Sequence, residues 1–330
     1  MSGLSGRFYF KIYSMMYSKV YSVKIYNTRS LIISLLCAFL ILSCSTVSPV
    51  TSKRDVPQRF DTLLAITPHW QSLSTEGLDF FSARIRDPRL EIWALRVDLT
   101  HPSLGIIISE HEAVNGVMQE SIIPSSRVSS FTKRYNAVAG INTAPFRPVS
   151  GREGEERTIV GIAVSGGTLV APPYSFYDAL VFYNDGRAAI VRQSELLENP
   201  EKLENIENAT GGFLIVLENG DLASRFPESG NVRHPRSAAG VSADGRTLYL
   251  LVIDGRRPGS IGATEEEIGI ILKQLGAFDG INFDGGGSTA LALRYPDGRV
   301  RVVNTPIHRG IPNRERAVAT NLGITARRQD

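Results

Sequence analysis

A carboxylate followed at once by three glycines stands out in the C-terminal part of the sequence. A short apolar run in the stretch 280–289 leads to Asp284, and residues 285–287 are all glycine. Glycine adds no side chain to a core, so three in succession indicate a sharp bend or a ligand that approaches the backbone closely. A tight turn whose Asp caps its own backbone is the simpler interpretation. The polar residues elsewhere in the chain favour a ligand site instead.

Other polar residues also follow apolar runs or lie at glycine-rich corners. The set mixes carboxylates with guanidiniums, the combination expected for an anionic, hydroxyl-rich substrate. Taken singly, the members have ordinary structural explanations. A lone His234 is more often a hydrogen-bonded structural residue, and a lone Arg236 is more often part of a surface ion pair that contributes little. The candidates are Asn142, His234, Arg236, Asp254, Arg256, Asn282, Asp284, Ser288, Thr289, Asn304, Arg314, Glu315 and Arg316.

Several common catalytic and cofactor motifs fail on spacing. The glycine loop lacks the Lys of a Walker loop, and Ser288 does not stand in a G-x-S-x-G motif. The five His residues are scattered and form no H-E-x-x-H pair, so no zinc site is expected. Asp254, Asp279 and Asp284 could supply oxygen ligands to a structural Ca²⁺ or Mg²⁺, but no loop has EF-hand spacing. We therefore expect no required cofactor.

Hydrophobic periodicity predicts the elements that position these residues. Alternating or continuous apolar runs predict strands, and apolar residues at helical spacing predict helices. Thr264 with Glu267 fits a capping box, and Gly276 is expected to end the helix that follows. We expect strands at 93–99, 104–108, 137–142, 211–217, 247–253, 280–284 and 290–293, hairpins at 161–170 and 179–191, and helices at 125–136 and 265–275.

A β-helix-β unit is expected over residues 247–284. Crossovers of this kind usually join parallel strands, whose carboxyl ends lie on one edge of the sheet. Asp254 and Asp284 would then share the edge at which open α/β sheets place ligands. We predict an α+β fold with a mixed β-sheet core, flanking helices and this unit.

The charge of the chain is unevenly distributed. The formal net charge is +3 over 330 residues, but the segment before Ser43 carries five basic residues and no Asp or Glu. Without that segment the charge is 3 − 5 = −2, so the remainder has no basic face that would suggest nucleic-acid binding. Cys37 and Cys44 both lie near the N-terminus, which excludes disulfides and Cys-ligated metals from the remainder.

The N-terminal segment has the pattern of an export signal. The apolar run 31–42 suits a signal-peptide core better than a spanning helix. It leads into Ile-Leu-Ser-Cys, which resembles a bacterial lipobox with Cys44 as the lipidated residue. An uncleaved signal anchor is the alternative, and Met15 or Met16 would make a more typical start. We expect a lipoprotein-type signal peptide at 1–43, a tether at 44–60 and a single domain at 61–330, exported and lipid-anchored to the cell membrane or outer membrane.

The order of the motifs resembles one protein family. The series runs from His-Pro-Arg at 234–236 through Asp-Gly-Arg at 254–256 and Asn-Phe-Asp-Gly-Gly-Gly-Ser-Thr at 282–289 to Asn-Thr-Pro at 304–306 and Arg-Glu-Arg at 314–316. This series is similar to the phosphodiester glycosidase family, which includes the catalytic domain of the lysosomal uncovering enzyme and bacterial exopolysaccharide-type relatives. The resemblance covers about 93–324. One stretch departs from the family pattern, because Thr-Ala-Pro-Phe follows Asn142 where the family usually has Gly.

The resemblance implies hydrolysis of the bond between the anomeric carbon of a sugar and a phosphodiester, on cell-envelope or extracellular glycoconjugates. A phosphodiester is a weakly basic leaving group, so it needs cationic stabilisation more than a general acid. We assign that role to Arg236, supported by Arg256 or Arg316. We assign Asp284 as the nucleophile or base that meets the oxocarbenium-like carbon, with Asp254 as the second carboxylate.

The remaining candidates are assigned to substrate binding. The N–H groups of the three glycines could hold phosphate oxygens as an anion nest. Asn282, Ser288 and Thr289 would hold sugar hydroxyls, and His234 would orient Asp284 or Arg236. The expected substrate-binding residues are Asn142, His234, Arg256, Asn282, Gly285, Gly286, Gly287, Ser288, Thr289, Asn304 and Arg316.

Two alternative functions remain open. The first is a lipid-anchored, non-catalytic protein that binds glycans or phosphoglycans, which the altered stretch after Asn142 motivates. The second is a divalent-metal phosphoesterase, which a chelator would inactivate and which would release free phosphate.

Overall fold

The computed structural model describes residues 60–114, 116–149 and 152–326. The predictions of a signal peptide at 1–43 and a lipidated Cys44 lie outside the described residues, as does the tether apart from Phe60. Among the described helices, none combines the length and the apolar character that crossing a bilayer requires.

Continuous apolar runs form the central strands of the largest sheet. Strand β17 is buried from Leu248 to Ile253, as expected of a strand that is covered on both faces. Every strand pair in this sheet is antiparallel within the described ranges. In hydrogen-bonded order the sheet contains β1 (Gln71–Ser72), β2 (Leu78–Arg86), β3 (Arg89–Asp98), β17 (Thr247–Ile253), β16 (Arg236–Val241), β18 (Asp279–Asn282), β14 (Leu214–Glu218) and β15 (Asp221–Leu222).

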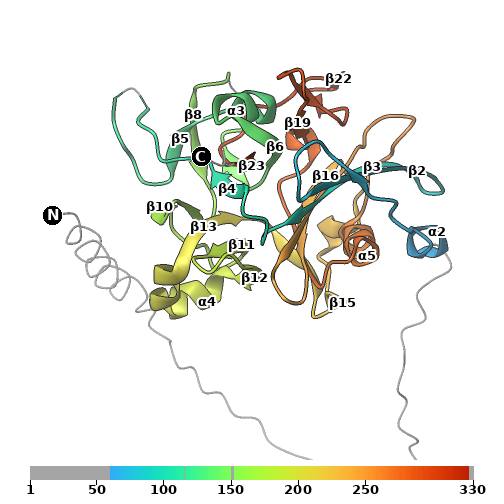
Figure 1. Cartoon of the computed structure of the whole chain (residues 1–330), viewed down its shortest axis with the longest axis horizontal. Coiled ribbons are helices and arrows are strands. Elements are labelled where there is room, and N and C mark those ends of the chain that lie inside the picture. Colours follow the sequence, from blue (N-terminus) through green and yellow to red (C-terminus); the bar gives the residue numbers. More distant parts are fainter. Residues whose placement is uncertain (1–59, 115, 150–151, 327–330) are drawn as a thin grey trace, which may run out of the picture. The chain divides into compact units, whose positions relative to one another are not determined.

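A second sheet packs on one face of the first and encloses the main hydrophobic core. Leu95 of β3, Leu250 of β17 and Ile281 of β18 meet Ile141 and Leu322 of the second sheet in this core. Strands β6, β23 and β4 lie side by side in Figure 1. In order, the second sheet contains β20 (Val300–Val302), β19 (Leu291–Arg294), β6 (Ala137–Asn142), β23 (Asn321–Ala326) and β4 (Leu104–Ile108).

The remaining strands form a third sheet and two small ones. The expected hairpins at 161–170 and 179–191 are confirmed as the β9–β10 and β11–β12 pairs. The third sheet contains β10 (Thr168–Ala171), β9 (Ala163–Ser165), β13 (Ile206–Gly211), β11 (Asp178–Tyr183) and β12 (Ala188–Arg192). The small sheets contain β5 (Ile122–Pro124), β8 (Glu156–Ile159) and β7 (Phe146–Arg147), and β21 (Ile307–His308) with β22 (Ile311–Pro312).

Helices cover the outer faces of the sheets. Helix α5 begins after Thr264, whose side chain forms the expected capping box with Glu267, and it ends at Gly276 in the left-handed conformation. Its apolar stripe packs on the face of the first sheet that points away from the second sheet. Helix α3 lies along β6 and β19 in Figure 1. The helices are α2 (Asp61–Leu64), α3 (Val128–Arg134), α4 (Gln193–Glu198) and α5 (Glu265–Leu275), with 3₁₀ turns at η2 (Pro200–Asn205), η3 (Glu228–Asn231) and η4 (Gly286–Ser288).

The α+β class agrees with this arrangement, but the described sheets are antiparallel rather than mixed, and β17 and β18, which precede and follow α5, do not pair with each other. Strands β17 and β18 run in the same direction because both pair antiparallel with β16, which lies between them. Strand β16 was not predicted, because its small residues produce no strong apolar pattern. The carboxyl ends of β17 and β18 still meet one edge, since Arg236 is opposite Ile253 and Ala238 is opposite Asn282.

One expected strand is divided between two sheets. The run 211–217 was predicted as a single strand, but β13 ends at Gly211 and β14 begins at Leu214. At the adjacent Gly212, a Cβ would lie 2.6 Å from the Ile281 side chain. The glycine pair therefore lets the chain pass closely over β18 as it crosses from the third sheet to the first.

Candidate functional site

Asp284 lies just beyond β18. Hydrogen bonds fix its backbone, but one oxygen of its side chain has no hydrogen-bond partner among the described residues. Its N–H donates to the Thr143 carbonyl at 2.8 Å, and its carbonyl accepts from Asn142 Nδ2 at 2.6 Å. Burial raises the pKa of the carboxyl to about 6, against hydrogen bonds from Ser288 and the Gly285 N–H and the charge of a nearby arginine. The Oδ2 atom is buried and has no hydrogen-bond partner among the described residues. A carboxylate in this condition is a candidate for acid–base or nucleophilic chemistry.

Asn142 holds this loop in place. It ends strand β6 and is fully buried. Besides its bond to the Asp284 carbonyl, its Oδ1 accepts from Ser237 Oγ at 2.7 Å and from the Ala290 N–H at 3.1 Å. These bonds connect both large sheets to the loop that carries Asp284. We predicted contact with the substrate for Asn142, but its side-chain oxygen and nitrogen both bond within the protein, which fits a positioning role.

Arg316 reaches the Asp284 carboxylate through one hydroxyl group. Its Nη1 donates to Ser288 Oγ at 3.1 Å, and the Ser288 hydroxyl in turn donates to the carboxylate of Asp284. Its Nε donates to His308 Nδ1 at 3.2 Å. Burial, reinforced by the positive charge of Arg316 and two further arginines, lowers the pKa of His308 to about 4. His308 is therefore neutral at physiological pH, and its Nδ1 can accept the hydrogen bond that orients Arg316.

The glycines let two guanidinium groups lie directly against the backbone. Gly286 has a φ of 62°, and a Cβ there would lie 2.9 Å from a terminal nitrogen of Arg256. A Cβ at Gly287 would lie 2.6 Å from Arg316 Nη2. Arg256 is exposed, and its guanidinium forms no ion pair or hydrogen bond within the described ranges. Two cations thus converge on the corner that follows Asp284, as an anionic group would require.

Part of the expected anion nest is already occupied. The Gly286 N–H donates to the Pro235 carbonyl at 2.8 Å, and the Gly285 N–H is directed to the carboxylate of Asp284 itself. These two N–H groups therefore have partners within the protein. The guanidinium side chains, rather than these N–H groups, are the donors that remain for an anion.

Arg236 differs most from its predicted role. It is buried, with Nε donating to the Ala263 carbonyl at 3.0 Å and Nη2 to the Val232 carbonyl at 2.9 Å. Its Nη1 lies 3.5 Å from Glu265 Oε1, which also accepts from Asn282 Nδ2 at 3.1 Å. Burial lowers the pKa of Arg236 and raises that of Glu265, so desolvation outweighs their pairing. Because these donors bond within the protein, the geometry favours a structural role over leaving-group stabilisation.

His234 lies beside this buried pair. Its backbone exchanges two hydrogen bonds with Ala263, at 3.3 and 3.0 Å, and its ring is half-buried. Burial lowers its pKa, and the charges of Arg236 and Arg256 lower it further. No hydrogen bond from its ring occurs within the described ranges, so the predicted orienting role stays a prediction.

Asp254, the second predicted carboxylate, is buried, and both of its carboxylate oxygens accept hydrogen bonds from the protein. It accepts from Arg257 Nη2 at 2.7 Å, from Asn304 Nδ2 at 3.0 Å and from the Thr305 N–H at 3.0 and 3.1 Å. Arg257 also pairs with Glu91 of β3. Asn304 Nδ2 also donates to the Thr289 carbonyl at 3.2 Å, and its Oδ1 accepts from the Leu291 N–H at 2.9 Å. This network joins three separate segments of the chain, which fits a structural role better than catalysis.

Unpartnered polar atoms concentrate around the glycine loop. Buried polar groups in native proteins normally have partners, so such atoms need an explanation. Within the described ranges, four of the six buried side-chain atoms without a partner lie on or next to this loop: Glu265 Oε2, Asn282 Oδ1, Asp284 Oδ2 and Thr289 Oγ1. A hydroxyl-rich ligand could supply the missing bonds.

Three residues that the fold brings to the site were not predicted from the sequence. His308, Glu265 and Arg257 contact Arg316, Arg236 and Asp254 respectively. A lone histidine in a two-residue strand gives no sequence signal. Glu265 was explained as part of an acidic first turn that suits the helix dipole. Arg257 stands next to Arg256, and the sequence alone does not tell which of the two turns inward.

Glu315 anchors the segment that carries Arg316. Its carboxylate accepts from the Ser129 N–H at 3.0 Å and from the Ser129 hydroxyl at the start of α3. Burial raises the pKa of Glu315, and the bonds from Ser129 oppose this. The segment is thereby held against the second sheet and its helix.

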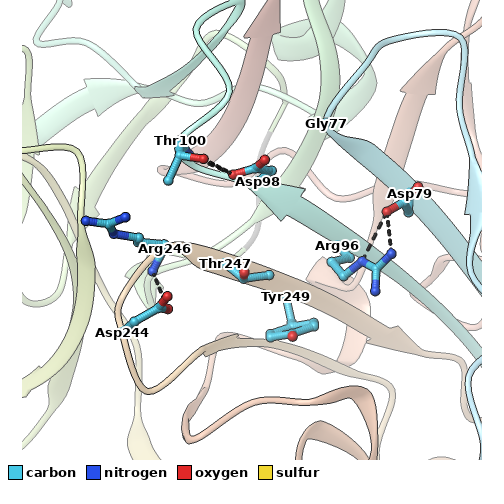
Figure 2. A pocket seen from close by; sticks show the side chains of 9 residues that line it. All are labelled: Gly77, Asp79, Arg96, Asp98, Thr100, Asp244, Arg246, Thr247 and Tyr249. Atoms are coloured by element: carbon cyan, nitrogen blue, oxygen red, sulfur yellow. Dashed lines mark hydrogen bonds and ion pairs between the residues drawn. The ribbon is translucent and has the colours of Figure 1, made fainter.

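A polar cavity of about 510 Å³ lies at the other end of strand β17. The strand begins in this cavity at Thr247 and ends before Asp254, roughly 20 Å away at the usual rise per residue. Figure 2 shows Arg96 turned toward Asp79, with bonds of 3.0 and 2.7 Å. None of the predicted site residues lines it. Its Asp79 and Arg96 side chains already bind each other, so we place the chemistry at Asp284.

The described residues contain no group of three or more His, Cys, Asp and Glu side chains that could hold a metal ion. Asp254 and Asp284, which we considered as oxygen ligands, belong to the separate hydrogen-bond networks described above. The possibility of a structural Ca²⁺ or Mg²⁺ stays untested.

Comparison with known proteins identifies the class. A sequence profile of the phosphodiester glycosidase family (NAGPA) matches residues 135–325, more than half of the chain. The chain therefore belongs to the phosphodiester glycosidase family, as the order of its motifs predicted. The matched range contains the predicted site residues from Asn142 to Arg316.

Individual relatives are more distant. The SPbeta prophage-derived uncharacterized protein YomE of Bacillus subtilis (strain 168) is 28% identical over 205 residues, which is 60% of this chain and 29% of that protein. The chain thus spans less than a third of that relative's length.

Solved structures share the fold. The auto-inhibited catalytic domain of zebrafish N-acetylglucosamine-1-phosphodiester alpha-N-acetylglucosaminidase matches with a TM-score of 0.55 at 18% identity, covering 79% of this chain and 89% of that one. A hypothetical protein from Synechocystis matches with a TM-score of 0.56 at 16% identity, covering 80% of this chain and 65% of that one. At these identities the likeness concerns the fold alone.

Proposed function

We propose that this protein hydrolyses the bond between the anomeric carbon of a sugar and the oxygen of a phosphodiester. The carbon–oxygen bond breaks, and its electron pair leaves with the phosphate, which becomes a phosphomonoester. The oxygen of water forms the new bond to the carbon, and one proton of that water is released. Asp284 supplies the carboxylate that meets the developing positive charge, as nucleophile or as base.

One observation carries this proposal: an incompletely satisfied carboxylate lies beside two guanidinium groups. Within the described ranges Asp284 Oδ2 has no hydrogen-bond partner, while Arg256 and Arg316 lie against Gly286 and Gly287 directly after it. A glycosyl phosphodiester needs this combination, because positive charge develops at the sugar carbon while negative charge develops on the departing phosphate. Family membership supports the reaction class.

We assign stabilisation of the leaving group to Arg256 and Arg316 rather than to Arg236. The donors of Arg236 bond to Glu265 and to two backbone carbonyls, whereas Arg256 is exposed and unpaired within the described ranges. Arg316 is already oriented by His308 and Ser288. A preorganised cation of this kind stabilises developing charge without reorganising during the reaction.

The direct test incubates the purified full chain with several nucleotide sugars and sugar phosphodiesters. We expect one free sugar per turnover and no free inorganic phosphate. The second product, detected with the sugar by NMR, should be a phosphomonoester from a sugar phosphodiester and a nucleoside diphosphate from a nucleotide sugar. Failure to release sugar from every phosphodiester would overturn the proposal. A matched incubation with chelator identifies the alternatives. Loss of activity with free phosphate as product indicates a metal phosphoesterase, and binding without turnover indicates a glycan-binding protein.

The stretch 143–146 departs from the family pattern, but its contacts favour a catalytic protein over a non-catalytic binding protein. Thr143 and Ala144 are buried, and the Thr143 carbonyl accepts from the Asp284 N–H. The Thr143 hydroxyl accepts from Thr210 Oγ1 at 2.7 Å. Residues 143–144 thus position the backbone of Asp284. The bond from its N–H to the Thr143 carbonyl is present although Thr143 stands where the family usually has Gly.

We also propose that the protein is exported and lipid-anchored through Cys44, where it acts on cell-envelope or extracellular glycoconjugates. The support is the apolar run 31–42 followed by Ile-Leu-Ser-Cys. Fractionation of cells producing the full chain or the Cys44→Ala variant tests this. The native chain should sediment with membranes and carry a lipid label, and the variant should lack the label. An unlabelled native chain in the cytosol would contradict it.

A further inference from the structure

An exposed aromatic segment lies between strands β10 and β11 of the third sheet. It spans residues 172–177, and Phe176 and Tyr174 are 73% and 42% exposed. The ring centroids of Tyr174 lie 5.5 Å from those of Phe176 and 5.2 Å from those of Tyr177. Tyr177 in turn makes an edge contact with Phe213 at 5.2 Å. We call these four rings, from solvent to interior, the aromatic wall.

The inner end of the aromatic wall adjoins the candidate active site. The Phe213 N–H donates to the Asn282 carbonyl at 2.7 Å, two residues before Asp284. The pKa of Tyr177 is raised first by burial, then by Tyr174, and also by the negative charge of Asp284. The aromatic wall therefore begins at the strand end that precedes Asp284. The two guanidiniums contact the glycines that follow Asp284.

Hydrogen bonds hold the aromatic segment at both ends. Gln193 is fully buried at the start of α4, and its Oε1 accepts from the Tyr174 N–H at 2.8 Å. Its Nε2 donates to the Asp178 carbonyl at 2.8 Å. The Asp178 carboxylate accepts from the Ile215 N–H at 2.7 Å, which ties the segment to β14. Large apolar rings held rigidly at the surface usually mark a binding site.

We propose that the aromatic wall binds the sugar ring of the substrate, with Phe176 and Tyr174 stacking on its apolar face. This inference deepens the proposed function and rests on it. The C–H groups of a pyranose face complement an aromatic face, whereas a charged phosphate complements the guanidiniums. The substrate would thus lie across Asp284, with its sugar on the aromatic wall, its anomeric carbon at the carboxylate and its phosphate near Arg256 and Arg316.

The test compares a Phe176→Ala/Tyr174→Ala variant with the native full chain. On the phosphodiester that the native protein cleaves best, we expect KM to rise about tenfold or more, as loss of stacking predicts, while kcat changes little. Tyr295→Ala is the matched control, because Tyr295 is 38% exposed but lies under Arg301 in the turn between β19 and β20. The control should retain native KM. An unchanged KM in the double variant would overturn the inference.

Saturation-transfer NMR separates this inference from the proposed function. The probes are the free sugar and the nucleoside diphosphate that remains when the anomeric carbon–oxygen bond of a nucleotide sugar is cleaved. Transfer to the sugar-ring protons that disappears in the double variant supports the inference. Transfer to the base protons alone would assign the aromatic wall to the leaving group and overturn it. If the native chain neither cleaves nor binds any sugar compound, the proposed function fails as well. Circular dichroism melts check that both variants fold.

Discussion

Two aspartates at the same edge of the first sheet have opposite surroundings. Asp254 follows β17 and accepts hydrogen bonds from Arg257, Asn304 and Thr305. Asp284 follows β18, and the described residues supply no partner for one of its buried oxygens; its pKa is raised to about 6. Burial raises the pKa of Asp254 too, but the bonds from its three partners oppose the shift.

The difference separates structural from reactive carboxylates. A satisfied buried carboxylate fixes the segments that supply its partners, and removing it leaves those partners unpaired. An incompletely satisfied one retains capacity for a ligand and stays close to its titration point at neutral pH. The arginines follow the same rule, since Arg257 and Arg236 bind protein carboxylates while Arg256 remains exposed.

The sharpest test of the comparison is Asp284→Asn. We expect kcat to fall at least about 10³-fold, as is typical when a residue of the reacting set is removed. At pH 8 the variant should be as stable as the native protein or more stable, by at most about 3 kcal/mol, because a buried charge is removed. Turnover assays and thermal melts measure both effects. Near-native turnover in a folded variant would contradict the assignment.

Arg316→Ala should have the next largest effect. Loss of a preorganised cation at the leaving group should lower kcat about 10²-fold. Because the side chain is only half-buried and its hydrogen bonds go to the uncharged acceptors His308 and Ser288, we expect a small change in the melting temperature. Steady-state kinetics should also show a larger loss than in the matched variant Arg314→Ala, whose side chain is exposed. Equal losses of kcat in the two variants would show that Arg316 is not the cation that stabilises the leaving group.

The pH profile tests the titration of Asp284. If its ionised form reacts, kcat/KM should fall about tenfold for each pH unit below about 6, since protonation removes the reactive carboxylate. The same shift affects stability with the opposite sign. The folded state binds this proton more tightly than the unfolded state does, so this group's contribution to stability falls as pH rises from about 4 to about 6. A kcat/KM that stays flat down to pH 4.5 would exclude Asp284 as the group that reacts while ionised.

Asp254→Asn should affect turnover least and stability most. The substitution leaves Arg257 with Glu91 as its remaining carboxylate partner and should cost about 3 kcal/mol of unfolding free energy. Turnover per folded molecule should stay within about tenfold of native, since the Asp254 carboxylate bonds to Arg257, Asn304 and Thr305 and has a structural role. Denaturant titration and active-site-normalised kinetics measure the two quantities. A loss of turnover as large as that of Asp284→Asn in a stable variant would make Asp254 catalytic.

Most of the regular elements were predictable because their signals are local. The β17 run, the capping box at Thr264 and the glycine at 276 correspond to the observed strand and helix. Strand β16 was not predicted, because Ala, Ser and Gly become strand residues only when neighbours pair on both sides. The split at 212 likewise depends on contact with β18.

The sequence alone identified the family, the catalytic candidate Asp284 and the glycines beside it, because residue types in a fixed order carry that information. It also placed Asp254 and Asp284 at one edge. Only the tertiary structure decided which carboxylate is satisfied and which arginine is exposed. Those properties depend on partners such as Asn304, Glu265 and His308, which are distant in sequence or carry no local signal. Burial and hydrogen bonding are properties of the assembled edge, and they distinguish a structural aspartate from a reactive one.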